Sequence, residues 1–530
     1  MPSITRRDFL MKVGQAGGFS AAFLTMQALG LMPRAEAMRP LEAAPDVGKG
    51  VTVAILGGGI AGLVAAFEMK ALGYKCTVLE ARHRPGGRNW SVRGGDTVEF
   101  LDGTKQKCDW ERGHYQNFGP ARLPSVHKNM LGYCRKLGVA LEVEVNTSRS
   151  SYLENDSANG GKPALQREVI NDTRGHVSEL LAKCIRQGAL DQDLSPEDRD
   201  RMLSFLRQYG PLDSAGLYVG SSRAGYVTLP GAGNQAGAIA KPVDMHTLLD
   251  EDFWNGILFE ENFDMQATMF QPVGGMDRIP YAFAHALGKT VHYEAVVTEI
   301  RKTASGVRIA YTHGGRARTL EADYCFCALP MTMLKKIPND FSAPYKQVIE
   351  DCSYAAAYKI AWESRRFWEQ DYNIYGGLEF VNTGCSPVWF PSGGMFTDRG
   401  VLVSGYAMDS SGEFATMTME QKFAASRETI ERLHPGHGKE LEKPMYVSWR
   451  QIAFNEGSWV QSYGPGEPTR GLGDDTQRIN PGYETLLQPD GPIYFIGDHV
   501  SHIVAWQEGA AVSALRAVQM LSDRVHAARA

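Results

Sequence analysis

The hydrophobic pattern is most regular near the start of the chain. A β-branched, mostly apolar run at 51–56 is followed at once by a glycine-rich turn at 57–62. A strand that is apolar on both faces suits a buried position in a parallel sheet. A helical run at 63–72 then ends before Gly73, and a second strand at 75–80 ends in an acid. The pattern predicts a strand–turn–helix–strand unit of an α/β fold.

The turn and the acid have the chemistry of a dinucleotide site. Gly57 permits the tight turn, Gly59 lets the backbone approach a pyrophosphate, and Gly62 lets the helix pack on the strand. The helix N-terminus stabilises phosphate charge, and Glu80 can accept hydrogen bonds from ribose hydroxyls. An acid at this position disfavours the 2′-phosphate of NADP. The unit therefore predicts a bound dinucleotide other than NADP.

The first 37 residues are typical of an export signal. Arg6 and Arg7 precede a weakly apolar stretch at 13–31, and small residues at 35–37 suit cleavage. We predict a twin-arginine signal peptide at 1–37 and a periplasmic or secreted protein. The alternative is a membrane anchor, but the stretch contains several glycines. No later run reaches the roughly 18 apolar residues of a span, so we expect no stable membrane span.

Composition excludes several classes of protein. The chain has 530 residues, 43% hydrophobic and 22% charged, which rules out global disorder. A formal net charge of -5 argues against a nucleic-acid partner. The 8 cysteines include no CxxC pair, so neither a disulfide scaffold nor a zinc site is expected, and we predict no metal.

Residues 81–88, with the sequence ARHRPGGR, resemble the second fingerprint of the FAD-dependent amine oxidase superfamily, which includes the L-amino-acid oxidases. Residues 270–277 resemble its central glycine motif, and 493–498 resemble its terminal strand and Gly-Asp turn. No second GxGxxG follows a strand, which favours a substrate that reduces the flavin directly. The resemblance implies FAD bound by Gly57, Gly59, Ile60, Ala61, Gly62, Glu80, Ala81, Arg82, Gly87, Arg88, Gly119, Pro120, Ala121, Arg122, Val297, Gly497, Asp498, Ala505 and Trp506.

The resemblance also implies individual roles around the cofactor. Arg88 is expected near the pyrophosphate, the backbone of Val297 at the adenine, and Asp498 at the ribityl chain. The helix predicted from about Gln507 would point its N-terminus at the N1–C2 edge of the flavin, where reduced flavin is negatively charged. Ser458 stands where monoamine oxidases have a flavin-linked cysteine, so non-covalent FAD is expected.

The resemblance and the patterns together predict the domain organisation. We expect a Rossmann-like FAD-binding domain, a mixed-sheet substrate-binding domain and a helical subdomain. The helical subdomain rests on runs at 169–188 and 196–209. The predicted boundaries are 48–125, 251–304 and 480–530 for the FAD-binding domain, 126–250 for the helical subdomain and 305–479 for the substrate-binding domain.

The segment at 117–124 contains the Gly-Pro-x-Arg-x-Pro run that resembles L-amino-acid oxidases. The resemblance implies that Arg122 clamps the substrate carboxylate, and a guanidinium is suited to this because it offers two parallel donors. The alternative is an arginine that bonds backbone carbonyls in a turn. Relatives often add a tyrosine hydroxyl, but Phe390 takes that position here, and Tyr375 or Tyr406 are candidate replacements.

Three further side chains are predicted at the substrate. By resemblance, Trp459 and Trp506, with Ala505, line the pocket over the flavin, where rings exclude water and disfavour the charged ammonium. Ordinary core packing is the alternative for both tryptophans. Lys346 is predicted to match the family lysine that holds a water near flavin N5, and Lys335 and Lys336 are nearby rivals.

These observations predict an FAD-dependent L-amino-acid oxidase. It would convert an L-amino acid and O₂ to a 2-oxo acid, ammonia and hydrogen peroxide. The alternatives are a polyamine or monoamine oxidase, an amino-acid dehydrogenase that passes electrons to a quinone, and a non-catalytic FAD-binding protein. The wall facing the substrate side chain is expected around 209–229, and relatives commonly form dimers, so a homodimer is one possibility.

Overall fold

The computed structural model describes residues 41–409, 412–464 and 480–529. The predicted signal peptide at 1–37 lies outside these residues. A five-stranded parallel sheet, ordered β14-β2-β1-β18-β26, forms the centre of the cofactor half. Its strands are β1 (Thr52–Leu56), β2 (Lys75–Leu79), β14 (Val291–His292), β18 (Tyr324–Cys327) and β26 (Ile493–Phe495).

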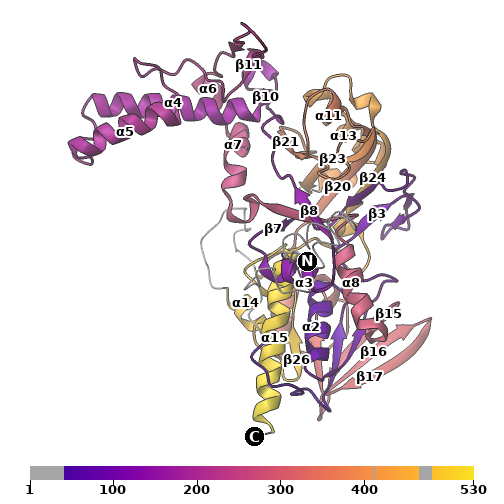
Figure 1. Cartoon of the computed structure of the whole chain (residues 1–530). Helices are drawn as coiled ribbons and strands as arrows, with labels where there is room; N and C mark the ends of the chain where they lie inside the picture. The colour runs from indigo at the N-terminus through magenta and orange to yellow at the C-terminus, as the bar shows by residue number, and fades with distance from the viewer. Residues whose placement is uncertain (1–40, 410–411, 465–479, 530) are drawn as a thin grey trace, which may run out of the picture.

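Helices cover this sheet. Helix α2 (Ile60–Ala71) packs against α8 (Arg278–Leu287) and against α15 (Gln507–Ala527), the C-terminal helix. Figure 1 shows α2 and α15 side by side although they lie at opposite ends of the sequence. Their contact is made by small residues, and Ala66 and Ala514 are fully buried. The predicted strand–turn–helix–strand unit and the terminal helix are both confirmed.

Strand β18 corrects a predicted boundary. The sequence predicts residues 305–479 in the substrate-binding domain, but β18 lies in the cofactor sheet between β1 and β26. Its residues Cys325, Phe326 and Cys327 are fully buried, as an interior parallel strand requires. An antiparallel sheet precedes it, formed by β15 (Ala295–Lys302), β16 (Val307–His313) and β17 (Arg316–Ala322).

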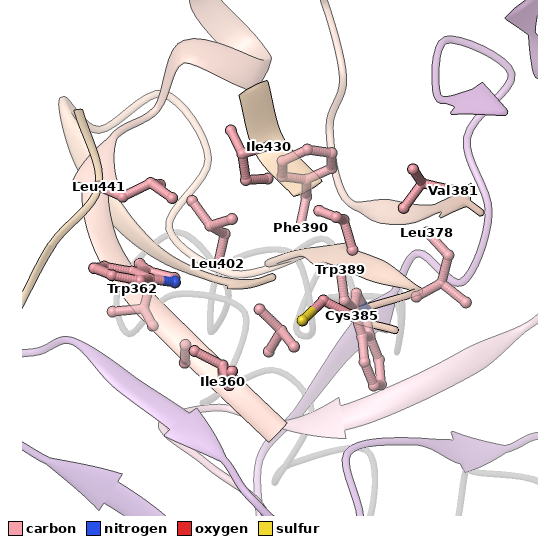
Figure 2. Close-up of a cluster of buried hydrophobic side chains, with 14 of the residues drawn as sticks. Ile360, Trp362, Leu378, Val381, Cys385, Trp389, Phe390, Leu402, Ile430 and Leu441 are labelled. Atoms are coloured by element: carbon pink, nitrogen blue, oxygen red, sulfur yellow. The ribbon is translucent and has the colours of Figure 1, made fainter. Parts of the chain in front are cut away.

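The substrate half is built on a mixed seven-stranded sheet, ordered β10-β9-β21-β22-β23-β20-β24. Its strands are β9 (Tyr152–Glu154), β10 (Ala164–Leu165), β20 (Ala357–Arg365), β21 (Gly377–Val381), β22 (Val388–Phe390), β23 (Arg399–Met408) and β24 (Glu442–Ser448). Helix α13 (Met419–Leu433) packs on β23, and apolar side chains fill the space between them (Figure 2). A three-stranded sheet of β7 (Leu123–Pro124), β13 (Met269–Pro272) and β8 (Leu141–Glu144) lies where the two halves meet.

A helical arm extends from the body (Figure 1). It contains α4 (Gln166–Arg186), α5 (Pro196–Tyr209), α6 (Met245–Leu248), α7 (Glu251–Leu258) and the ribbon β11–β12 (Tyr226–Thr228 and Ala238–Ile239). The two predicted helical runs are therefore confirmed, but the arm is shorter than 126–250, because the part before α4 forms α3 (Lys128–Lys136), β8, β9 and β10. None of the described helices combines the length and the apolar character of a membrane span.

Candidate functional site

The three turn glycines have different surroundings. Gly57 has φ +100°, a conformation that glycine adopts without strain. A Cβ on Gly62 would lie 2.0 Å from the carbonyl oxygen of Gly57, so any side chain there would push helix from strand. A Cβ on Gly59 would meet no described atom within 4 Å. Gly59 thus borders open space at the N-terminus of α2, which has no side-chain cap, and this geometry fits a pyrophosphate.

Glu80 is buried at the carboxyl end of β2. One carboxylate oxygen accepts a hydrogen bond from the Gly58 amide at 2.7 Å, and the other from the Arg82 amide at 2.9 Å. The backbone carbonyl of Glu80 accepts a hydrogen bond from the Ala295 amide at 2.9 Å. This bond holds the start of β15 next to the end of β2. Two residues along β15, Val297 is buried. The structure thus brings together the residues predicted for the ribose and the adenine.

Arg88 and Asp498 form an ion pair. Both guanidinium NH2 groups contact the Asp498 carboxylate, one of them at 3.1 Å, and the Ser458 carbonyl accepts a further hydrogen bond from Arg88. Burial opposes ionisation of Asp498, but the Arg88 charge and hydrogen bonds hold its pKa below the ordinary value. The Ala505 amide also donates to Asp498, at 3.2 Å. The predicted pyrophosphate, ribityl and pocket residues therefore converge on one point.

Ser458 and the start of α15 complete the cofactor side. The Ser458 hydroxyl donates to the Ala355 carbonyl at 2.7 Å and accepts from the Ala357 amide at 3.1 Å, so it is committed to the backbone. Nε2 of Gln507 and Nε2 of His499 are buried and have no partner among the described residues. Buried polar atoms are normally hydrogen-bonded. These unpartnered nitrogens fit a polar ring system such as a flavin.

Arg122 is buried just before β7. One NH2 group lies 3.2 Å from the Met265 sulfur, and the guanidinium carbon lies 4.1 Å from the centre of the Trp389 ring. The Nε atom has no partner among the described residues. Within those residues the side chain makes no hydrogen bond to a backbone carbonyl, so the structure does not support the alternative of an arginine that serves a turn.

The predicted lysine is wrong, and a different one lies at the site. Lys346 is exposed on α10 (Ala343–Asp351), which does not suit a group in a dry pocket. Lys359 of β20 is buried, and its Nζ donates to the carbonyls of Asn117 and Gly119 at 2.8 and 2.7 Å. Burial, and secondly the Arg122 charge, lower the pKa of Lys359 to about 7. A single charge within the apolar run 355–362 was the signal that could have identified it.

The rival lysines also lie elsewhere. Lys335 donates to two carbonyls near the end of α10, and Lys336 pairs with Glu456 at the surface. Neither has a contact with Arg122 in the described structure.

The prediction for Phe390 is wrong as well. Its ring packs on Phe367 and Trp368 in the hydrophobic core and is fully buried. Figure 2 shows Phe390 pointing toward Ile430, while Trp389 points to the other side of β22. Successive side chains of a strand face opposite sides of the sheet. An error of one residue in the predicted register of β22 therefore put Phe390 in the position that Trp389 holds.

The two candidate tyrosines differ in position. Tyr406 of β23 stacks on Trp389 with ring centres 6.5 Å apart, and its ring lies 4.8 Å from the Lys359 ammonium. Tyr375 packs instead on Phe396. Of the two, Tyr406 is the neighbour of the substrate-binding candidates.

The predicted pocket tryptophans are both half-buried. Trp506 packs edge to face on His127, at 5.0 Å between ring centres, and precedes α15. The backbone of Trp459 is held in place by a hydrogen bond, which its carbonyl oxygen accepts from the Ala355 amide at 2.9 Å. Ala505 is exposed and has φ +69°. Incomplete burial leaves both rings able to contact a ligand.

Glu144 was not predicted at all. It ends β8 and is only 3% exposed. Burial raises its pKa to about 7, although the nearby charge of Arg122 and the Trp389 side chain oppose the shift. We use the name Arg122 cluster for Arg122, Glu144, Lys359, Trp389 and Tyr406. An acid in the polar–apolar alternation at 141–146 has no distinguishing signal in the sequence.

Among the described residues, one group has the composition of a metal site. Ligand atoms of Glu111, His114 and Glu363 all lie within 4.8 Å of one another. Lys443 and Arg399 already pair with these carboxylates, however. These ion pairs with two cationic side chains give the group the structure of an ion-pair network.

Comparisons with known proteins agree with this architecture. The family model for flavin-containing amine oxidoreductases matches residues 60–521. A flavin-dependent L-tryptophan oxidase from Lentzea aerocolonigenes is 26% identical over 88% of this chain and 97% of its own. An L-amino-acid oxidase from Daboia russelii is 25% identical and covers 88% of each chain.

Solved structures add a likeness of fold. A putrescine oxidase with bound putrescine superimposes with a TM-score of 0.55 at 18% identity, over 90% of this chain and 99% of the other. A cyclohexylamine oxidase from Brevibacterium oxydans also has a TM-score of 0.55, at 17% identity, over 90% and 98%.

Proposed function

The chain belongs to the family of flavin-containing amine oxidoreductases, and from this premise we propose that it is an L-amino-acid oxidase with non-covalently bound FAD and O₂ as the acceptor. The observation that supports an amino-acid substrate is Arg122, a buried guanidinium with an unpartnered Nε. An amine without a carboxylate has no use for this charge. The relatives named as L-tryptophan and L-amino-acid oxidases support the same substrate class.

The residues of this chain have distinct tasks in such a reaction. Arg122 holds the α-carboxylate and so orients the α-hydrogen. Trp459 and Trp506 exclude water, which favours the neutral amine over the ammonium. FAD supplies the two-electron chemistry. Lys359, with a pKa near 7, is able to hold or release a proton beside Arg122 at neutral pH.

The overall reaction balances. The amino acid loses its α-hydrogen as a hydride and its nitrogen loses a proton, which gives an imino acid. Two electrons and two protons reduce O₂ to hydrogen peroxide. Water hydrolyses the imino acid to a 2-oxo acid and ammonia.

An anaerobic substrate screen tests the proposal. Mixing the holoenzyme with L-amino acids is expected to bleach the flavin absorbance, and admission of air is expected to restore it with formation of peroxide. Bleaching by amines alone would indicate a polyamine or monoamine oxidase. Bleaching without peroxide in aerobic turnover would indicate a dehydrogenase with a quinone acceptor. A protein that no substrate bleaches would be a non-catalytic flavoprotein.

Substitution of Arg122 provides the residue-level test. Arg122→Ala is expected to lower kcat/KM for amino acids about tenfold or more, since a charged bidentate contact is lost. Arg122→Lys keeps the positive charge but loses the two parallel N–H donors of the guanidinium, so it is expected to be only partly active. Unchanged amino-acid turnover in Arg122→Ala would contradict the proposed clamp. Flavin content serves as the control for folding.

We also propose export by the twin-arginine route, supported by the Arg6-Arg7 run. This route carries folded proteins, which suits a chain that takes up its cofactor in the cytoplasm.

A further inference from the structure

Glu144 leaves buried hydrogen-bonding capacity unused. Within the described residues the carboxylate meets at most one donor, the Trp389 side chain, and Nε of Arg122 meets no acceptor. Both side chains are more than nine-tenths buried and interact electrostatically. Leaving a buried polar group unpaired costs about 1–3 kcal/mol. Acceptor and donor atoms left unpaired in one buried cluster are typical of a site that a polar ligand completes.

The charged and titratable groups of the cluster gather around Arg122. Arg122, in the segment before β7, is the charge that interacts with Glu144, while Lys359 of β20 and Tyr406 of β23 interact with Arg122. Strand β13 places the uncharged Met269 opposite Glu144. Lys359 is already held by two carbonyls, so it is not free to pair with the acid. Arg122 is therefore the charge that Glu144 and a ligand carboxylate would share.

An ionised Glu144 would repel the proposed substrate. A substrate carboxylate on Arg122 would put two anions close together in a dry pocket, where one of two neighbouring carboxylates retains a proton. A protonated carboxyl is a hydrogen-bond donor, and its bond to a carboxylate is short and strong. The position predicted for a second contact, Phe390, points into the core instead.

We propose that Glu144, in its protonated form, donates a hydrogen bond to the substrate carboxylate held by Arg122 and is thus the second half of the carboxylate clamp. This inference rests on the proposed function. This step changes no bond to carbon. Above neutral pH the Glu144 carboxylate takes up one proton from solvent when the substrate binds, and the proton returns to solvent when the product leaves.

The consequence is an affinity for carboxylates that depends on pH. Burial holds the pKa of Glu144 at about 7 in the free protein. Below that pH the carboxyl is already protonated and the affinity is constant. Above it, binding requires proton uptake, so the affinity falls about tenfold per pH unit.

The test uses benzoate, a carboxylate without an amine, and the flavin absorbance of the holoenzyme as the signal. For the wild type, Kd is expected to rise at least tenfold between pH 6 and pH 9. Glu144→Gln donates from its amide at every pH, so its Kd is expected to lose the part of this rise that is due to Glu144. The double variant Glu144→Gln with Lys359→Met also removes the titration of Lys359 and is expected to have a constant Kd. Glu144→Leu lacks a donor and is expected to bind weakly at both values. Flavin content and Tm show whether each variant is folded.

Three results would overturn the inference. One is a wild-type pH dependence that Glu144→Gln retains, and another is no benzoate binding by the wild type. The third is a Tyr406→Phe variant that binds benzoate more weakly at every pH, together with a Glu144→Gln variant whose Kd equals that of the wild type at every pH. That pair of results would make the Tyr406 hydroxyl the second donor. Failure of the proposed function is distinct, because amino acids would then not bleach the flavin even in the wild type.

Discussion

The cofactor half and the substrate half assemble their sites in different ways. Most groups predicted to hold FAD come from one continuous stretch, residues 57–88, with Asp498 added by the turn that follows β26 of the same sheet. The Arg122 cluster instead takes one residue from each of several segments, including β8, β20, β22 and β23. A local motif is sufficient for the first kind of site. The second depends on strand register and on which residues are buried.

The errors of prediction follow this division. Gly59, Gly62, Glu80 and Arg88 lie where the motif predicts them. Lys346 and Phe390 do not, because the side of a strand or helix that faces the site depends on the register of the packed elements, which short motifs do not contain. The lysine and the aromatic ring that lie beside Arg122 are Lys359 and Trp389.

The largest expected effects separate two glycines of the cofactor turn. Gly62→Ala places a Cβ 2.0 Å from a backbone oxygen, so we expect it to destabilise the protein by about 1–3 kcal/mol or more and to lose FAD. Gly59→Ala adds a methyl in open space at φ -74°, so the protein is expected to fold normally and yet bind FAD at least tenfold more weakly. Thermal unfolding and flavin content measure both effects.

If Gly59→Ala retained FAD as well as the wild type does, the pyrophosphate would lie elsewhere. A folded, yellow Gly62→Ala would show that the helix–strand contact tolerates a methyl group.

The next comparison is between the predicted and the observed lysine. Lys359→Met is expected to lower kcat about tenfold, whereas Lys346→Met, an exposed change, is expected to stay within about twofold of the wild type. Steady-state kinetics from pH 6 to 9 measures both. Equal effects would contradict the placement of Lys359 at the reaction.

Lys359 also makes a prediction for stability. Its pKa is about 7 in the folded protein and ordinary in the unfolded chain, so the unfolded chain binds more protons between pH 7 and about 10. The free energy of unfolding therefore gains a contribution from this residue as pH rises through that window. Lys359→Met is expected to lack this gain, as denaturant titrations at pH 7 and pH 9 would show.

The smallest effects distinguish the two faces of β22. Trp389→Phe weakens a cation–π contact worth about 0.5–2 kcal/mol, so KM for amino acids is expected to rise a few fold, together with a fall in Tm from the smaller buried ring. Phe390→Tyr buries a hydroxyl in the core, so Tm is expected to fall while KM stays constant. A rise of KM in Phe390→Tyr alone would reverse this assignment.

The class of fold and the glycine turn could be predicted from sequence alone, and Arg122 could be named as a candidate, because these signals act within a few residues of one another. Glycine conformations, strand and helix periodicity, and a proline-flanked arginine need no distant partner to be recognised.

Which lysine and which aromatic ring face Arg122, and the presence of an acid near it, became known from the folded arrangement of the strands. The protonation of Glu144 and Lys359 is governed by burial, and their burial is produced by strands far apart in the chain. Desolvation is a property of the packed molecule, so no residue pattern taken alone contains it.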